Sequence, residues 1–121
     1  SIIDKSSGDL IGMTGFLNIS QKHAHAQFYI TIGEENFRGK GLPNEIIPAV
    51  VTYGFKFLRL NKVYLWTLFN NQRARSVYEN NGFKEEAVLK AHLHCRGAFQ
   101  DVVQHSIFVT DEIRPSQNEI V

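Results

Sequence analysis

The stretch NQRARSVYENNGF, residues 71–83, contains a helix start, a helix face and a helix stop. Asn71 can cap a helix that begins at Gln72, and Asn81-Gly82 supplies the left-handed residue that ends one. Four positions at the spacing i, i+3, i+4 and i+7 fall on one face of that helix: Asn71, Ala74, Arg75 and Tyr78. We therefore predict a helix over 72–80 with this face turned toward a neighbour or a ligand.

The segments on either side of this helix predict a sheet. Strand patterns cover 2–3, 10–19, 24–33, 62–69, 83–94 and 99–109, and a second helix pattern covers 44–60. The segment 62–69 is almost continuously apolar, so we place it in the centre of the sheet. The order β-β-β-α-β-α-β-β predicts an α+β fold with a mixed, mostly antiparallel sheet and two main helices.

Length and charge limit the class of protein. The 121 residues fit one domain, residues 1–121, and the polar segment 111–121 is expected to be a flexible tail. The formal net charge of +1 argues against nucleic acid or a membrane surface as a partner. One cysteine, Cys95, and a start without a signal-peptide pattern favour the cytoplasm, and no apolar run is long enough for a membrane span.

A glycine-rich basic loop precedes the helix pattern at 44–60. Glycines let backbone N–H groups converge there, and the helix N-terminus adds a positive dipole, so pyrophosphate would fit. The anion-binding candidates are Arg38, Gly39, Lys40, Gly41, Leu42, Pro43 and Asn44. A Walker A loop is rejected because the glycine spacing is wrong and Gly41 stands where Ser or Thr should hold Mg²⁺.

Both motifs carry a resemblance. Arg38-x-x-Gly41-x-Pro43 is similar to the Q/R-x-x-G-x-G/A acetyl-CoA signature of the GNAT superfamily of N-acetyltransferases, and residues 71–83 match its N-x-x-A-x-x-x-Y-x-x-x-G-F signature at every marked position. Further stretches resemble its ribosomal-protein N-terminal and spermidine acetyltransferase branch. Pro43 departs from the pattern because it offers no N–H to the pyrophosphate.

The resemblance implies an acetyl-CoA-dependent N-acetyltransferase. Acetyl-CoA would be the cosubstrate, and a neutral primary amine would attack the thioester directly. The acceptor would be a small molecule or a peptide: a protein α-amine, a polyamine or an amino sugar. Tyr78 would act as general acid toward the departing thiolate. The other cofactor-binding positions implied are Ile30, Thr31 and Ile32, with a backbone oxyanion donor, together with Asn71, Ala74 and Arg75.

The general base is left open by the sequence. Gln27 stands where relatives often carry a glutamate, and an amide cannot accept the proton of the amine. The substitutes are Glu34, Glu35, His23 and His25. The pairs His23-x-His25 and His92-x-His94 could each place two imidazoles on one strand face, but no carboxylate or thiolate ladder accompanies them. We therefore predict no metal.

The resemblance also bears on completeness and assembly. Members of the family normally begin with a strand and two helices before the hairpin that starts here at Ile2. An N-terminally short domain would leave a sheet edge unpaired, which predicts a homodimer or higher homo-oligomer. The alternative function is a catalytically weak or inactive acetyl-CoA-binding module, or a truncated interaction domain.

Overall fold

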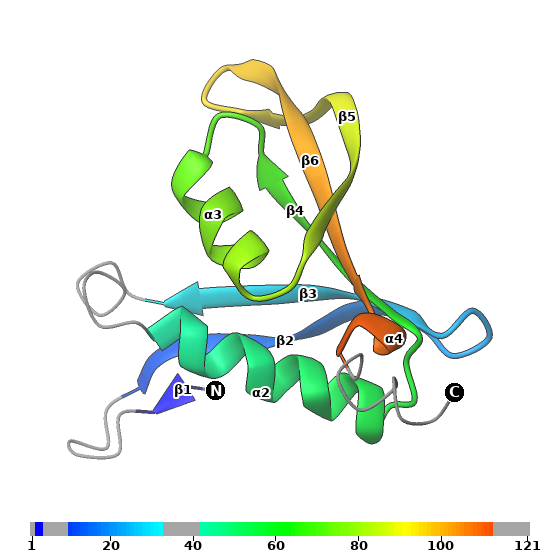
Figure 1. The fold of residues 1–121 in the computed structure, drawn as a ribbon. Coiled ribbons are helices and arrows are strands. Elements are labelled where there is room, and N and C mark those ends of the chain that lie inside the picture. The colour runs from blue at the N-terminus through cyan, green and yellow to red at the C-terminus, as the bar shows by residue number, and fades with distance from the viewer. Residues whose placement is uncertain (1, 4–9, 33–41, 113–121) are drawn as a thin grey trace.

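A mixed sheet with two main helices forms the fold (Figure 1). The computed structural model describes residues 2–3, 10–32 and 42–112. The strands are β1 (Ile2–Ile3), β2 (Leu10–Ser20), β3 (His25–Ile32), β4 (Lys62–Leu68), β5 (Lys84–Cys95) and β6 (Ala98–Phe108). The helices are α2 (Leu42–Lys56), α3 (Gln72–Asn80) and the short α4 (Val109–Glu112).

The sheet runs in the order β1-β2-β3-β4-β6-β5. Strands β3 and β4 pair in parallel and every other pair is antiparallel. The predicted α+β class with a mixed, mostly antiparallel sheet is confirmed, and β4 lies inside the sheet as its apolar sequence predicts.

Helices α2 and α3 cover the same face of the sheet, α2 over β2 and β3 and α3 over β4 (Figure 1). Alternation in the strands turns one set of side chains toward them, and in β4 every second residue is buried. The core joins residues of β3, α2, β4 and β6 with two from the connections: Ala26, Phe28, Ile47, Val51, Phe55, Leu60, Val63, Leu65, Phe83 and Ile107.

Some element ends differ from the sequence-based expectation. Helix α2 begins at Leu42 and ends at Lys56, whereas the apolar spacing predicted 44–60. Arg59 takes a left-handed φ of 58° and the Leu60 N–H donates to the Gly54 carbonyl, so the chain turns back while its apolar spacing continues. The short α4 was not predicted, and its last two residues lie in the predicted tail, which otherwise falls outside the described residues.

Strands β3 and β4 diverge soon after they meet. Three positions are in register, His25 with Lys62, Ala26 with Val63 and Gln27 with Tyr64. Beyond them the strands separate, and each leads toward a helix on the covered face (Figure 1). The divergence leaves backbone groups of β3 without a β4 partner from Phe28 to Ile32. None of the described helices is long and apolar enough to cross a bilayer.

Candidate functional site

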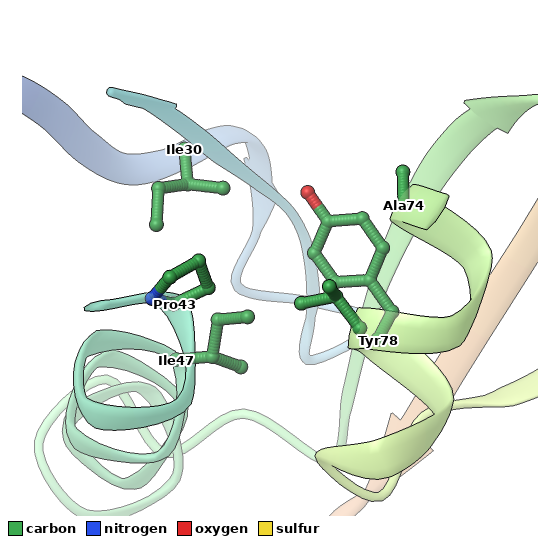
Figure 2. Close-up of a pocket in the computed structure, with 6 residues that line it drawn as sticks. Ile30, Pro43, Ile47, Ala74 and Tyr78 are labelled. Carbon is green, nitrogen blue, oxygen red and sulfur yellow. The ribbon is translucent and has the colours of Figure 1, made fainter. Parts of the chain in front are cut away.

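An apolar pocket lies on the helix face where β3 and β4 diverge (Figure 2). One side comes from β3 and the first turns of α2, and the other from α3. Its lining residues are Ile30, Pro43, Ile47, Ala74, Val77 and Tyr78. It holds about 200 Å³ of empty space, including the part open to solvent. The space is small, so only one end of a longer molecule would enter it.

Hydrogen bonds hold the two helices that form the walls of the pocket. Asn71 caps α3, since its Oδ1 accepts from the Ala74 N–H at 3.1 Å, as the sequence predicted. Ala74 presents a single methyl group, which leaves room beside it. The end of α3 is joined to the start of α2, because Asn81 Nδ2 donates to Asn44 Oδ1 at 2.9 Å. That bond holds the two walls together across 37 positions of sequence.

Tyr78 is the polar group of the pocket. Its ring packs edge-on against Phe83 with the centroids 6.0 Å apart, and Figure 2 shows its hydroxyl directed toward β3. Burial raises the pKa of the Tyr78 hydroxyl above its ordinary value of 10.0. Within the described part of the chain the hydroxyl has no hydrogen-bond partner. Tyr78 therefore keeps its proton at neutral pH and can donate it into the pocket.

The structure brings some of the predicted site residues together. Ile30, Pro43, Ala74 and Tyr78 line the pocket, and Pro43 is buried. Two further lining residues, Ile47 and Val77, were not predicted as site residues. Val77 lies one helical turn beyond Ala74, so the same face rule could have found it.

Asn71 and Arg75 do not line this pocket. Asn71 is occupied as the helix cap and borders a separate, polar hollow near the β5–β6 hairpin. Arg75 Nη1 donates to the Phe69 carbonyl at 2.9 Å, and its Nη2 pairs with Glu85 at 3.0 Å. The predicted common face therefore holds for Ala74 and Tyr78, while Arg75 ties α3 to β5 and to the turn before it.

The other predicted residues are placed less centrally. Thr31 is exposed, and Asn44 is exposed at the start of α2. The backbone of Ile32 and Leu42 is described, but their side chains are not. Four predicted anion-binding residues lie outside the described residues: Arg38, Gly39, Lys40 and Gly41.

The substitutes for a general base that the structure describes, His23 and His25, do not line this pocket. His25 opens β3 and Ile30 lies five residues on, about 16 Å away at roughly 3.3 Å per residue. His23 stacks on His25 with centroids 6.0 Å apart, and Gln27 Oε1 accepts from Asn18 Nδ2. Glu34 and Glu35 lie outside the described residues. Among the residues described, no group of three or more His, Cys, Asp or Glu could hold a metal ion.

The chain is similar in sequence to known proteins of one family. A family model described as an acetyltransferase (GNAT) domain matches residues 1–84. Spermidine N(1)-acetyltransferase of Vibrio cholerae is 31% identical over 116 residues, covering 96% of this chain and 66% of that protein. A putative ribosomal N-acetyltransferase of Bacillus subtilis is 33% identical, covering 83% of this chain and 54% of that protein.

A solved structure of a Vibrio cholerae spermidine N-acetyltransferase mutant superposes with a TM-score of 0.89 at 32% identity. The match covers 95% of this chain and 67% of that one. The chain thus spans between about half and two thirds of the length of the curated relatives it matches.

Proposed function

Since the chain belongs to the GNAT acetyltransferase family, we propose that it transfers an acetyl group from acetyl-CoA to a primary amine by direct attack. The observation that carries the proposal is the apolar pocket at the β3–β4 divergence, with one protonated phenol inside it. Such a pocket excludes water around a reacting thioester while keeping one proton donor at hand.

The pocket suits the acetyl and thiol end of acetyl-CoA. Its lining is apolar apart from the Tyr78 hydroxyl, and its volume is too small for the whole molecule. The pyrophosphate would lie at the start of α2, where we expect Arg38, Gly39, Lys40 and Gly41 to bind it. Pro43 contributes a wall and no N–H, so fewer backbone donors serve the pyrophosphate than the family signature would provide.

Two groups would act on the thioester. A backbone N–H of the Ile30–Ile32 segment would donate to the carbonyl oxygen, and the unpaired β4-side edge of β3 supports this role. Tyr78 would donate toward the sulfur as the C–S bond breaks. Both contributions come from rigid elements, which suits stabilisation of a transition state.

The acceptor class follows from amine chemistry. The matched relatives are named for spermidine and for a ribosomal substrate, and both present primary amines. A lysine-like amine of pKa about 10.4 is neutral in about one molecule in 2,500 at pH 7, whereas an α-amine of pKa about 7.7 to 8.0 is neutral about 10 to 20% of the time. Because no Asp, Glu or His is among the described residues that line the pocket, we favour a protein α-amine or a low-pKa amino sugar over a polyamine.

Homodimerisation in the cytoplasm belongs to the same proposal, with neither nucleic acid nor a membrane as partner. Met13, Leu17 and Ile19 of β2 are 52%, 49% and 49% exposed, on the first long strand of the sheet. Strand β1 pairs with β2 at only two positions, so the described part of that edge is mostly open to another strand. Sedimentation at micromolar concentration should give a dimer or larger species, and a clean monomer would contradict this.

A thiol-release assay across an amine panel tests the activity. The panel should contain an N-terminal peptide, an amino sugar, spermidine and a no-amine control for hydrolysis of the thioester. We expect at least one primary amine to raise CoA release above that control, with the peptide ahead of spermidine near pH 7. Saturable acetyl-CoA binding by calorimetry without amine-dependent release would instead favour the inactive binding module.

A further inference from the structure

Strand β5 carries an irregularity that the pocket chemistry leaves unexplained. Leu89 pairs with Val102 and Leu93 with Gln100, so four steps along β5 match two along β6. Ala91, inside this bulge, has a φ of 47°, a left-handed value that is unfavourable for alanine. The Ala91 N–H donates to Asp101 Oδ1 at 2.8 Å, which holds the strained turn in place. Bulges are over-represented beside active sites, where they redirect a side chain.

Here the redirected side chain is His92. Its ring meets Trp66 edge-on, with centroids 4.7 Å apart and planes at 86°. Strand β6 lies between β5 and β4, so the two residues belong to strands that are not neighbours. The contact exists because His92 lies in the stretch between Leu89 and Leu93, where β5 leaves its regular pairing with β6.

The Trp66 side chain lies on the face of the sheet opposite the helices, where hydrogen bonds hold it in place. It lies two residues beyond Tyr64, the last β4 residue in register with β3, and so beside the gap. Its Nε1 donates to Gln104 Oε1 at 3.0 Å, and Gln104 Nε2 donates to Glu86 at 3.0 Å. His92 is exposed, and its ring nitrogens bond to no other described residue.

On the β3 side of the gap, one side chain of this face turns away from β4. The Tyr29 ring of β3 leans across Gly15 of β2, where a Cβ would lie only 3.2 Å from it, and so away from β4. The helix face, by contrast, carries α2, α3, the core and the pocket that would hold the thioester end of acetyl-CoA. Among the described residues, the face that carries Trp66 and His92 thus offers an amine an approach to the gap from the side opposite the pocket.

We infer that His92 is the general base, accepting the proton that the acceptor amine loses while Trp66 forms the wall of the acceptor site; this rests on the proposed acetyl transfer. The amine lone pair forms the new C–N bond, the C–S bond breaks, and its electron pair leaves on sulfur. His92 takes one N–H proton and returns it to solvent. Tyr78 donates a hydrogen bond to the sulfur as its negative charge develops, and the thiolate then takes a proton from solvent.

The carboxylate that Trp66 reaches through Gln104 is committed elsewhere. Glu86 accepts hydrogen bonds from Lys62, Ser106 and Gln104, and these hold the pKa of its carboxyl at about 2, so it is a poor base. Histidine, in contrast, is the residue that most often serves as a proton acceptor near neutral pH.

The test compares His92→Ala and His92→Gln with His94→Ala, an exposed histidine two residues along β5 that contacts Phe99. We expect both His92 variants to lose about 100-fold or more in kcat/KM for the amine, with acetyl-CoA affinity unchanged. Added imidazole should restore part of the His92→Ala rate. His94→Ala should stay within about twofold of the unmodified chain.

Trp66 is the only tryptophan, so its fluorescence reports amine binding to the CoA-loaded protein without turnover. We expect a saturable amine-dependent change that both His92 variants retain. Rates within about threefold of the unmodified chain, or a loss that imidazole does not rescue, would overturn the base role. If the unmodified chain acetylates no amine, the proposed function fails, and a flat Trp66 titration would then overturn the acceptor site as well.

Discussion

Replacing Tyr78 by phenylalanine removes one hydroxyl and keeps the ring contact with Phe83. Because the hydroxyl bonds to no other described residue, unfolding free energy should change by less than about 0.5 kcal/mol. Any loss of activity then reports the chemistry. Urea unfolding of both proteins provides the stability control.

The magnitude follows from the proton that Tyr78 holds. A CoA-like thiol has a pKa of about 8.5, whereas burial places the pKa of Tyr78 above 10.0, so full transfer to the thiolate is uphill by at least about 2 kcal/mol. Tyr78 should therefore act mainly by donating a hydrogen bond as charge develops on sulfur. That places the expected loss in kcat near about 100-fold, the lower end of the range for general acids.

The assay is thiol release at saturating acetyl-CoA with the best amine of the panel. Because the pKa of Tyr78 is raised, its proton is present at every pH below about 10, and activity should show no fall from this group below that pH. Unchanged kcat in the phenylalanine variant would refute the acid role. A descending limb near pH 8 that disappears in the variant would refute the protonation argument.

Three further predictions concern stability. Gly54→Ala places a Cβ 2.7 Å from Phe16 Cζ, so overpacking should outweigh the gain in helix propensity. The free energy of unfolding measured in urea should fall by about 1 kcal/mol. A more stable variant would mean that the Phe16 ring moves freely. Glu86 has a folded pKa of about 2 against an ordinary 4.5, so its stabilisation is present above about pH 4.5 and lost toward pH 2. Full conversion of that pKa shift is about 3 kcal/mol, and since the carboxylate is 37% exposed, solvent screening reduces it to about 1 kcal/mol. Between about pH 5 and 2 the free energy of unfolding of Glu86→Gln should therefore fall by about 1 kcal/mol less than that of the unmodified chain. Parallel curves of unfolding free energy against pH would exclude the Lys62 pairing as the cause. Asn71→Ala should cost about 1 kcal/mol through the lost cap with little effect on acetyl-CoA affinity, whereas a large loss of affinity would return Asn71 to the binding site.

Local patterns predict most of the fold because they act over short distances. The alternation of Ala26, Phe28 and Ile30 and the cap at Asn71 each depend on near neighbours, and both are observed. The end of α2 could not be read from apolar spacing, because Leu58 and Leu60 continue to pack after the helix has stopped. The stop depends on the left-handed turn at Arg59.

The site was predicted in part for the same reason. Tyr78 and Ala74 follow from helix periodicity, but the direction of Arg75 depends on Glu85, ten residues away on another element. The bulge in β5 has no glycine to announce it. Ala91 accepts a left-handed conformation only because Asp101 of the neighbouring strand binds its N–H.

The three paired positions between β3 and β4 form a short seam that joins two parts of the sheet, β1-β2-β3 and β4-β6-β5. The part of β3 beyond the seam, from Gln27 to Ile32, is about 16 Å long. A change of about 5° in the angle between the two parts of the sheet would therefore move Ile32 by about 1.4 Å. Misplacement of about 1 Å in a reacting group can cost about 100-fold in rate. Packing at Ala26 and Val63, a fully buried pair in this seam, would therefore bear on the spacing of the site.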